Sequence, residues 1–139
     1  MKAPTVPDEL AAFIQASVKN VGLKNETLAD FVRFLIQGLP IIAAYGTAQT
    51  APGSERNSLD LMVLTAPALI SVTAFPSGRV VWSLTRVREC IYVSAEIVGN
   101  LVVGTISVGS ALSLRIADLL DQEGELNEFL VAVSKASRS

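Results

Sequence analysis

After Pro40 the chain is divided into short apolar segments, and this division limits its fold more than any other feature of the sequence. Each segment has the length of one β-strand, is rich in Val, Ile, Leu and Thr, and is followed by Gly, Pro, Asn or charged residues. Seven such segments cover residues 41–50, 59–66, 69–75, 79–87, 90–97, 101–108 and 111–118. Strands that follow one another at intervals of about 8–12 residues are typical of an antiparallel sandwich or barrel. No helical pattern alternates with them, so a parallel sheet is not expected.

Residues 1–38 have a helical pattern instead. A first helix is predicted over about residues 7–21, where a proline and two acidic residues open a run of apolar residues at helical spacing. Asn25 is a suitable N-cap for a second helix, and Gly38 is expected to end it. The sequence therefore predicts an N-terminal helical hairpin as a first unit, residues 1–38, and a β-rich unit over residues 39–139.

The end of the chain, residues 118–137, returns to helical spacing. Its apolar stripe is formed by Leu126, Phe129, Leu130 and Val133, and acidic residues gather at its beginning. Acids near the start of a helix interact favourably with its dipole. We therefore expect one amphipathic helix to follow the last strand.

Three stretches of the β-rich unit carry a family resemblance. Residues 61–72, LMVLTAPALISV, have an apolar strand that ends in Leu-Thr, a short turn and a second apolar strand. Residues 80–90, VVWSLTRVREC, form a strand that ends in a Leu-x-x-Val pattern. The third stretch, within residues 113–133, is SLRIAD…LNEFLVAV, a last strand that leads into a helix. Together these patterns resemble the bacterial pleckstrin-homology-like (PH-like) domains.

The resemblance implies a seven-stranded, strongly bent antiparallel barrel that is capped by the C-terminal helix. The expected fold class is thus α+β and mostly β, with the two N-terminal helices before the barrel. Family members often carry basic residues at the Leu-Thr turn, where this chain has Ala66, Pro67 and Ala68. Since PH-like barrels bind lipids, peptides and proteins alike, the resemblance implies a fold and leaves the function open.

The composition argues against most enzyme chemistry. The chain has no histidine, which excludes Ser-His-Asp and Cys-His nucleophiles and nearly all catalytic zinc sites. It contains no glycine-lysine loop for phosphates, and its acidic residues after Asp118 follow helical spacing without the order of a calcium loop. We therefore expect a protein without catalytic residues, metal or cofactor.

The chain is unusually apolar for its size. Half of its residues are apolar and 17% are charged, against roughly 25% charged residues in ordinary soluble domains. Its two long uncharged runs, residues 34–54 and 97–114, are interrupted by glycine, proline and polar residues and do not resemble membrane spans. We expect an intracellular, cytoplasmic protein that covers its excess apolar surface as a homo-oligomer.

Three arginines, Arg79, Arg86 and Arg88, lie within residues 77–90 and pose the main functional question. Strand alternation places Trp82, Leu84, Arg86 and Arg88 on one face, but neither face of this strand is cleanly apolar. In one interpretation this is a partly covered surface whose arginines pair with acidic side chains. In another it is a protein contact, because Trp and Arg are enriched at binding hot spots.

Two further hypotheses remain. Apolar residues on two faces of the second predicted helix suggest Phe31, Phe34 and Leu35 as a second protein-contact surface. Alternatively, Arg79, Arg86 and Arg88 hold the anionic head group of a lipid at a membrane surface. The net charge of −2 makes the lipid hypothesis the less favoured one and argues against nucleic acid as a partner.

Overall fold

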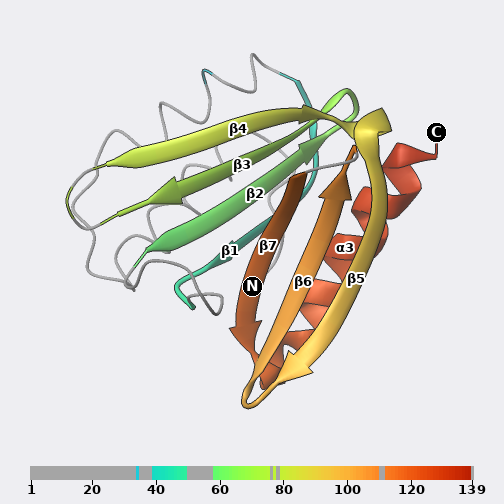
Figure 1. The fold of residues 1–139 in the computed structure, drawn as a ribbon. Coiled ribbons are helices and arrows are strands. Elements are labelled where there is room, and N and C mark those ends of the chain that lie inside the picture. Colours follow the sequence, from blue (N-terminus) through green and yellow to red (C-terminus); the bar gives the residue numbers. More distant parts are fainter. Residues whose placement is uncertain are drawn as a thin grey trace.

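The computed structural model describes residues 34, 39–49, 58–75, 77, 79–109 and 112–138. Within them the chain forms seven strands, two 3₁₀-helices and one α-helix (Figure 1). The elements are β1 (Ile41–Thr47), β2 (Leu59–Thr65), β3 (Ala68–Ala74), β4 (Val80–Arg86), η1 (Val87–Glu89), β5 (Cys90–Val98), β6 (Leu101–Val108), β7 (Leu112–Leu119), η2 (Leu120–Gln122) and α3 (Glu123–Ser137). The predicted hairpin over residues 1–38 lies outside the described residues except for Phe34.

The strands form two antiparallel sheets. One sheet has the order β1-β2-β3-β4 and the other has the order β5-β6-β7. Figure 1 shows that the two sheets run at a steep angle to each other, with α3 on the side of β5 and β6. The expected closed seven-stranded barrel is therefore wrong.

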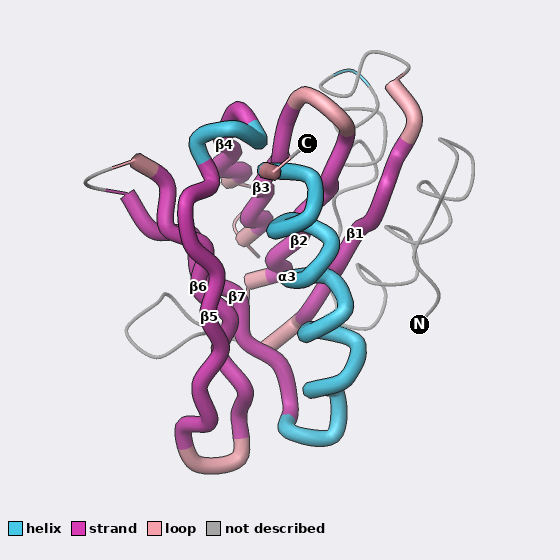
Figure 2. Tube along the Cα trace, turned by 90° about the vertical axis from the view of Figure 1, so that its right-hand side faces the viewer, coloured by secondary structure: helices cyan, strands magenta, loops and turns pink. Residues whose placement is uncertain are grey.

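The helix α3 packs against both sheets. It lies between β1 of the first sheet and β5 of the second (Figure 2), and it contacts both strands. β4 continues into β5 only through η1, without a ladder between the two strands. Side chains of α3 share one core cluster with residues of both sheets.

The predicted apolar stripe of the C-terminal helix is confirmed. Leu126, Phe129, Leu130 and Val133 are all buried and belong to one core cluster with residues of both sheets. Gly104 of β6 lets the helix come close, because a Cβ atom at this position would lie 3.1 Å from Leu130 Cδ1. The core thus has three contributors: the inner faces of the two sheets and one face of α3.

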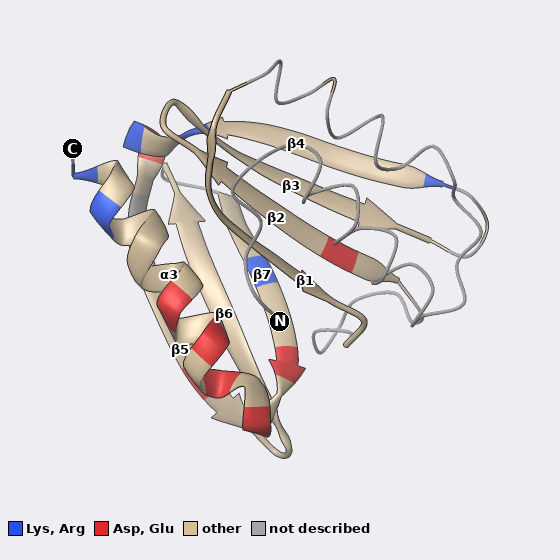
Figure 3. Ribbon diagram, turned by 180° about the vertical axis from the view of Figure 1, so that it is seen from behind, with Lys and Arg blue, Asp and Glu red and all other residues tan. Residues whose placement is uncertain are grey.

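Charges are unevenly distributed over this framework. Figure 3 shows acidic residues on the first turns of α3 and at the adjoining end of β7, and basic residues near the C-terminal end of the helix. Glu123 and Glu125 begin the helix and Lys135 lies in its last turn, which suits the helix dipole. Among the described residues, no helix is long and apolar enough to span a membrane.

Candidate functional site

β4 carries most of the residues that the sequence analysis singled out. It is the last strand of its sheet and pairs with β3 along one edge. Thr85 on this strand is buried and lies opposite Leu69 of the core cluster, so the odd-numbered side faces the interior. Trp82, Leu84 and Arg86 therefore lie on the outer face, and we call these three residues the β4 strip.

The β4 strip is the margin of a larger apolar surface. Trp82 lies opposite Val72 and Leu84 lies opposite Ile70 in the β3–β4 register. Val72 and Ile70 are buried, whereas Trp82 and Leu84 are 48% and 50% exposed and Arg86 is also exposed. The outer face of the first sheet thus reaches solvent at β4.

The other predicted contact residues are distributed differently. β4 ends at Arg86, and Arg88 lies in η1, where the alternation of a strand no longer applies. Arg88 is exposed. Phe34 is 72% exposed, while Phe31 and Leu35 lie outside the described residues.

Arg79 occupies a separate place at the other end of β4. The strand between Arg79 and Arg86 is seven residues long, which corresponds to roughly 23 Å at about 3.3 Å per residue. The Arg79 guanidinium carbon lies 4.4 Å from the centre of the Phe75 ring, a cation–π distance. The structure therefore does not bring Arg79 together with Arg86.

Instead, Arg79 lines a pocket of about 460 Å³ with Arg115 of β7. The pocket lies between the two sheets, since β2, β3 and β4 form one side and β7 the other. Its other polar side chains are the hydroxyls of Ser58, Thr73 and Ser113 and the carboxyl of Asp60. Sequence analysis did not single out Arg115. Alternation along β7 indicates on which face of its own sheet Arg115 lies, but it does not reveal which strands of the other sheet lie opposite that face.

Asp60 makes this pocket less favourable for an anion. Thr73 Oγ1 donates a hydrogen bond of 2.8 Å to Asp60 Oδ1. Burial raises the pKa of the Asp60 carboxyl above its usual value, and the Thr73 hydrogen bond opposes part of that shift. Two arginines and three hydroxyls thus share the pocket with one acidic group.

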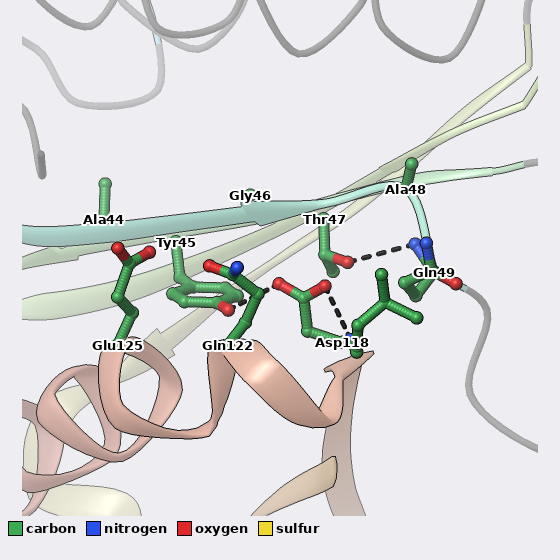
Figure 4. Close-up of a pocket in the computed structure, with 10 residues that line it drawn as sticks. Ala44, Tyr45, Gly46, Thr47, Ala48, Gln49, Asp118, Gln122 and Glu125 are labelled. Carbon is green, nitrogen blue, oxygen red and sulfur yellow. Dashed lines mark hydrogen bonds between the residues drawn. The ribbon is translucent and has the colours of Figure 1, made fainter. Parts of the chain in front are cut away.

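A second pocket, of about 330 Å³, lies between the end of β1 and the beginning of α3 (Figure 4). Tyr45 Oη donates a hydrogen bond of 2.5 Å to Asp118 Oδ2. The Leu119 N–H donates to Asp118 Oδ1 at 2.8 Å. In Figure 4 the Gln122 and Glu125 side chains project from the helix side toward β1, so both elements contribute polar groups.

The polar groups of this second pocket connect β1 to β7. Burial and the neighbouring Asp118 hold the pKa of the Tyr45 phenol well above its usual value, so the phenol remains a hydrogen-bond donor. Thr47 Oγ1 donates to the Ala117 carbonyl oxygen at 2.9 Å and accepts from the Gln49 N–H at 3.0 Å. These contacts indicate a structural role, and no group of His, Cys, Asp and Glu side chains in the described parts of the chain is arranged to hold a metal ion.

None of the protein-family models, curated proteins or solved structures compared with this chain matches it. The resemblance to PH-like domains therefore stays a prediction, and the functional argument has to come from the chain's own residues.

The Tyr45–Asp118 hydrogen bond is expected to stabilise the fold. Tyr45→Phe leaves the ring in place but removes the donor to a charged acceptor, which should lower the free energy of unfolding by about 1–3 kcal/mol. Urea denaturation at pH 7 measures this change. Tyr92→Phe, at a position 62% exposed, is the matched control, and an equal loss in both variants would contradict the assigned role.

The half-buried Asp60 predicts a specific pH dependence. An unfolded Asp releases its proton near pH 3.8, whereas folded Asp60 keeps its proton to higher pH. Between these values the folded chain binds more protons, so this group lowers the free energy of unfolding as pH rises. Asp60→Asn cannot titrate and can still accept from Thr73, so its stability relative to the wild type should increase from pH 4 to pH 7.

Urea denaturation at several pH values between 4 and 7 tests this expectation. Glu96→Gln, at an exposed carboxyl on β5, controls for the loss of one negative charge. If Asp60→Asn and Glu96→Gln differ from the wild type by the same amount at every pH, the burial of Asp60 does not influence stability in this way.

Proposed function

We propose that this chain is a non-catalytic protein-contact module that self-associates, and that the β4 strip is its principal contact surface. The observation that carries the proposal is the position of Trp82 and Leu84. Both are half-exposed on the last strand of a sheet, next to an exposed Arg86. Large aromatic and arginine side chains of this kind supply much of the binding energy in protein interfaces.

The rest of the chain supports contact with another protein. Half of its residues are apolar, and large hydrophobic side chains remain exposed in both sheets and on α3. Phe34, with Phe31 and Leu35 before and after it in the sequence, is the second candidate contact surface. We further propose a cytoplasmic location, since a single cysteine allows no internal disulfide, and no nucleic acid as partner, given the net charge of −2.

Binding of an anionic lipid head group is the second candidate function. The pocket with Arg79 and Arg115 favours it, because guanidinium and hydroxyl groups are suitable donors to phosphate oxygens. Arg86 lies at the far end of β4 and Arg88 follows in η1, so neither would contribute to the same site. Asp60 in the pocket and the net negative charge of the chain place this function second.

The leading proposal predicts that association depends on the β4 strip. Sedimentation velocity of the purified chain should show larger species as its concentration rises. Leu84→Lys should weaken this association at least about tenfold, since it places a charge in the centre of the contact. Val131→Lys on α3 is the matched control, because Val131 and Leu84 are both 50% exposed.

Two results would contradict this prediction. A wild-type chain that stays monomeric at every concentration would remove self-association from the proposal. Equal weakening by Leu84→Lys and Val131→Lys would show that association does not use the β4 strip in particular.

Flotation with liposomes separates the two candidate functions. The protein-contact proposal expects the chain to remain unbound to neutral and anionic liposomes, at low and at physiological salt. Lipid binding would instead give flotation with anionic liposomes alone, weakened by salt. If Arg79→Glu or Arg115→Glu abolished such flotation and Arg86→Glu did not, lipid binding at the pocket would replace the leading proposal.

A further inference from the structure

The second sheet ends in a group of apolar side chains at the turn between β5 and β6. Val98, the last residue of β5, pairs with Leu101 of β6, and Leu101 pairs with Leu119 of β7. The Leu120 N–H of η2 donates to the Asn100 carbonyl oxygen in the turn at 3.0 Å. This bond holds the residues that lead into α3 beside the turn. The exposed large apolar side chains at this end are Ile97, Val98, Leu119 and Leu120, and we call these four residues the hairpin tip.

The hairpin tip remains in contact with solvent on both faces of the sheet. Its four side chains are between 39% and 59% exposed. Ile97 and Val98 are consecutive on β5, so they point to opposite faces. Next to the tip on β6, Val102 and Val103 are buried. Single exposed apolar residues are common, but a group of them with a polar border marks a binding surface.

Acidic residues form the border of the hairpin tip. In the sequence, residues 89–114 and 116–134 contain no Lys or Arg. Arg115, between these ranges, lies four positions before Leu119 on β7, roughly 13 Å along the strand. Figure 3 shows acidic residues at this end of β7 and α3 and basic residues near the other end of the helix. The acidic side chains that precede or follow tip residues in the chain are Glu96, Asp118, Asp121 and Glu123.

This combination of an apolar centre and an acidic border indicates the chemistry of a partner. Protein interfaces have an apolar core and a polar rim, and the charges of the two partners are complementary. A complementary surface therefore carries apolar side chains surrounded by Lys and Arg. The phosphates of nucleic acids and anionic lipids would meet charges of their own sign. The hairpin tip of a second copy would do the same, since facing like charges are unfavourable.

We propose that the hairpin tip docks a basic amphipathic segment of another protein. The apolar side chains of that segment pack on the tip, and its Lys and Arg side chains lie against the acidic border. The inference goes beyond the proposed function, because the β4 strip belongs to the other sheet. It adds a second contact surface and states the charge of the partner.

Selection from a phage-displayed library of short random peptides tests this inference. The full chain is immobilised, and phage that also bind the Leu119→Ser variant are removed. This variant carries the same charge as the wild type, so the removal does not itself favour basic peptides. We expect the remaining peptides to contain apolar residues and more Lys and Arg than the unselected library. Fluorescence anisotropy of one labelled, selected peptide then gives its Kd.

Two matched pairs of variants locate the binding of that peptide. Leu119→Ser should raise the Kd at least about tenfold, while Leu112→Ser, at the exposed opposite end of β7, should leave it unchanged. Asp121→Lys should weaken binding, while Glu89→Lys, an equal change of charge before the other end of β5, should not. Ile97→Ser, at the most exposed residue of the tip, repeats the test at a position where folding does not depend on the side chain. Raising the salt concentration should weaken binding, because salt screens exposed charges.

Other results would overturn the inference. No remaining peptide, or peptides without an excess of Lys and Arg, would show that the tip does not select a basic partner. Equal effects of Leu119→Ser and Leu112→Ser would show that the tip is not the contact. Liposome flotation that is lost in Ile97→Ser would make a lipid surface the occupant. If Ile97→Ser prevents self-association and Leu84→Lys does not, the occupant is a second copy, and the role proposed for the β4 strip fails as well.

Discussion

The burial of one face of α3 against both sheets is the interaction on which the rest of the structure depends. Phe129 lies beside Tyr45 of β1, with ring centroids 6.1 Å apart, and Leu130 lies over Gly104 of β6. The same helix face thus contacts both sheets, which no ladder joins. Their separation is set by the volume of these side chains, because protein interiors are close-packed.

The separation of the sheets creates both candidate surfaces. A closed barrel has no strand edges, whereas here β4 is the last of the described strands in its sheet and carries the β4 strip. The pocket of Arg79 and Arg115 also lies where the two sheets face each other without pairing. Near β1 and β7, side-chain hydrogen bonds from Tyr45 and Thr47 take the place of a ladder and satisfy polar groups that would otherwise be buried without partners.

The position of the arginines supports the protein-contact proposal more than the lipid hypothesis. A head-group site requires several cationic groups to converge, but β4 holds Arg79 and Arg86 at its opposite ends. Each arginine therefore acts in its own surroundings: Arg79 lies against Phe75 and lines a pocket with Arg115 and the half-buried Asp60, and Arg86 lies on one strand face with the exposed Trp82 and Leu84. Contact through the β4 strip would involve the exposed Trp82 and Leu84 together with Arg86, while an anion site in the pocket would involve Arg79 and Arg115.

By itself, the sequence determined the local structure of the described residues. Strand-length apolar segments and helical spacing located seven strands and α3, and the stripe from Leu126 to Val133 was identified before any contact was known, because periodicity is set within a few residues. Only the tertiary structure decided that the sheets do not close into a barrel, that Trp82 faces outward and that Arg79 and Arg115 line one pocket. Both faces of β4 mix polar and apolar residues, so alternation could not assign its inner side. That residues of β4 and β7 line one pocket depends on how α3 and the two sheets pack together, and no short stretch of sequence encodes that packing.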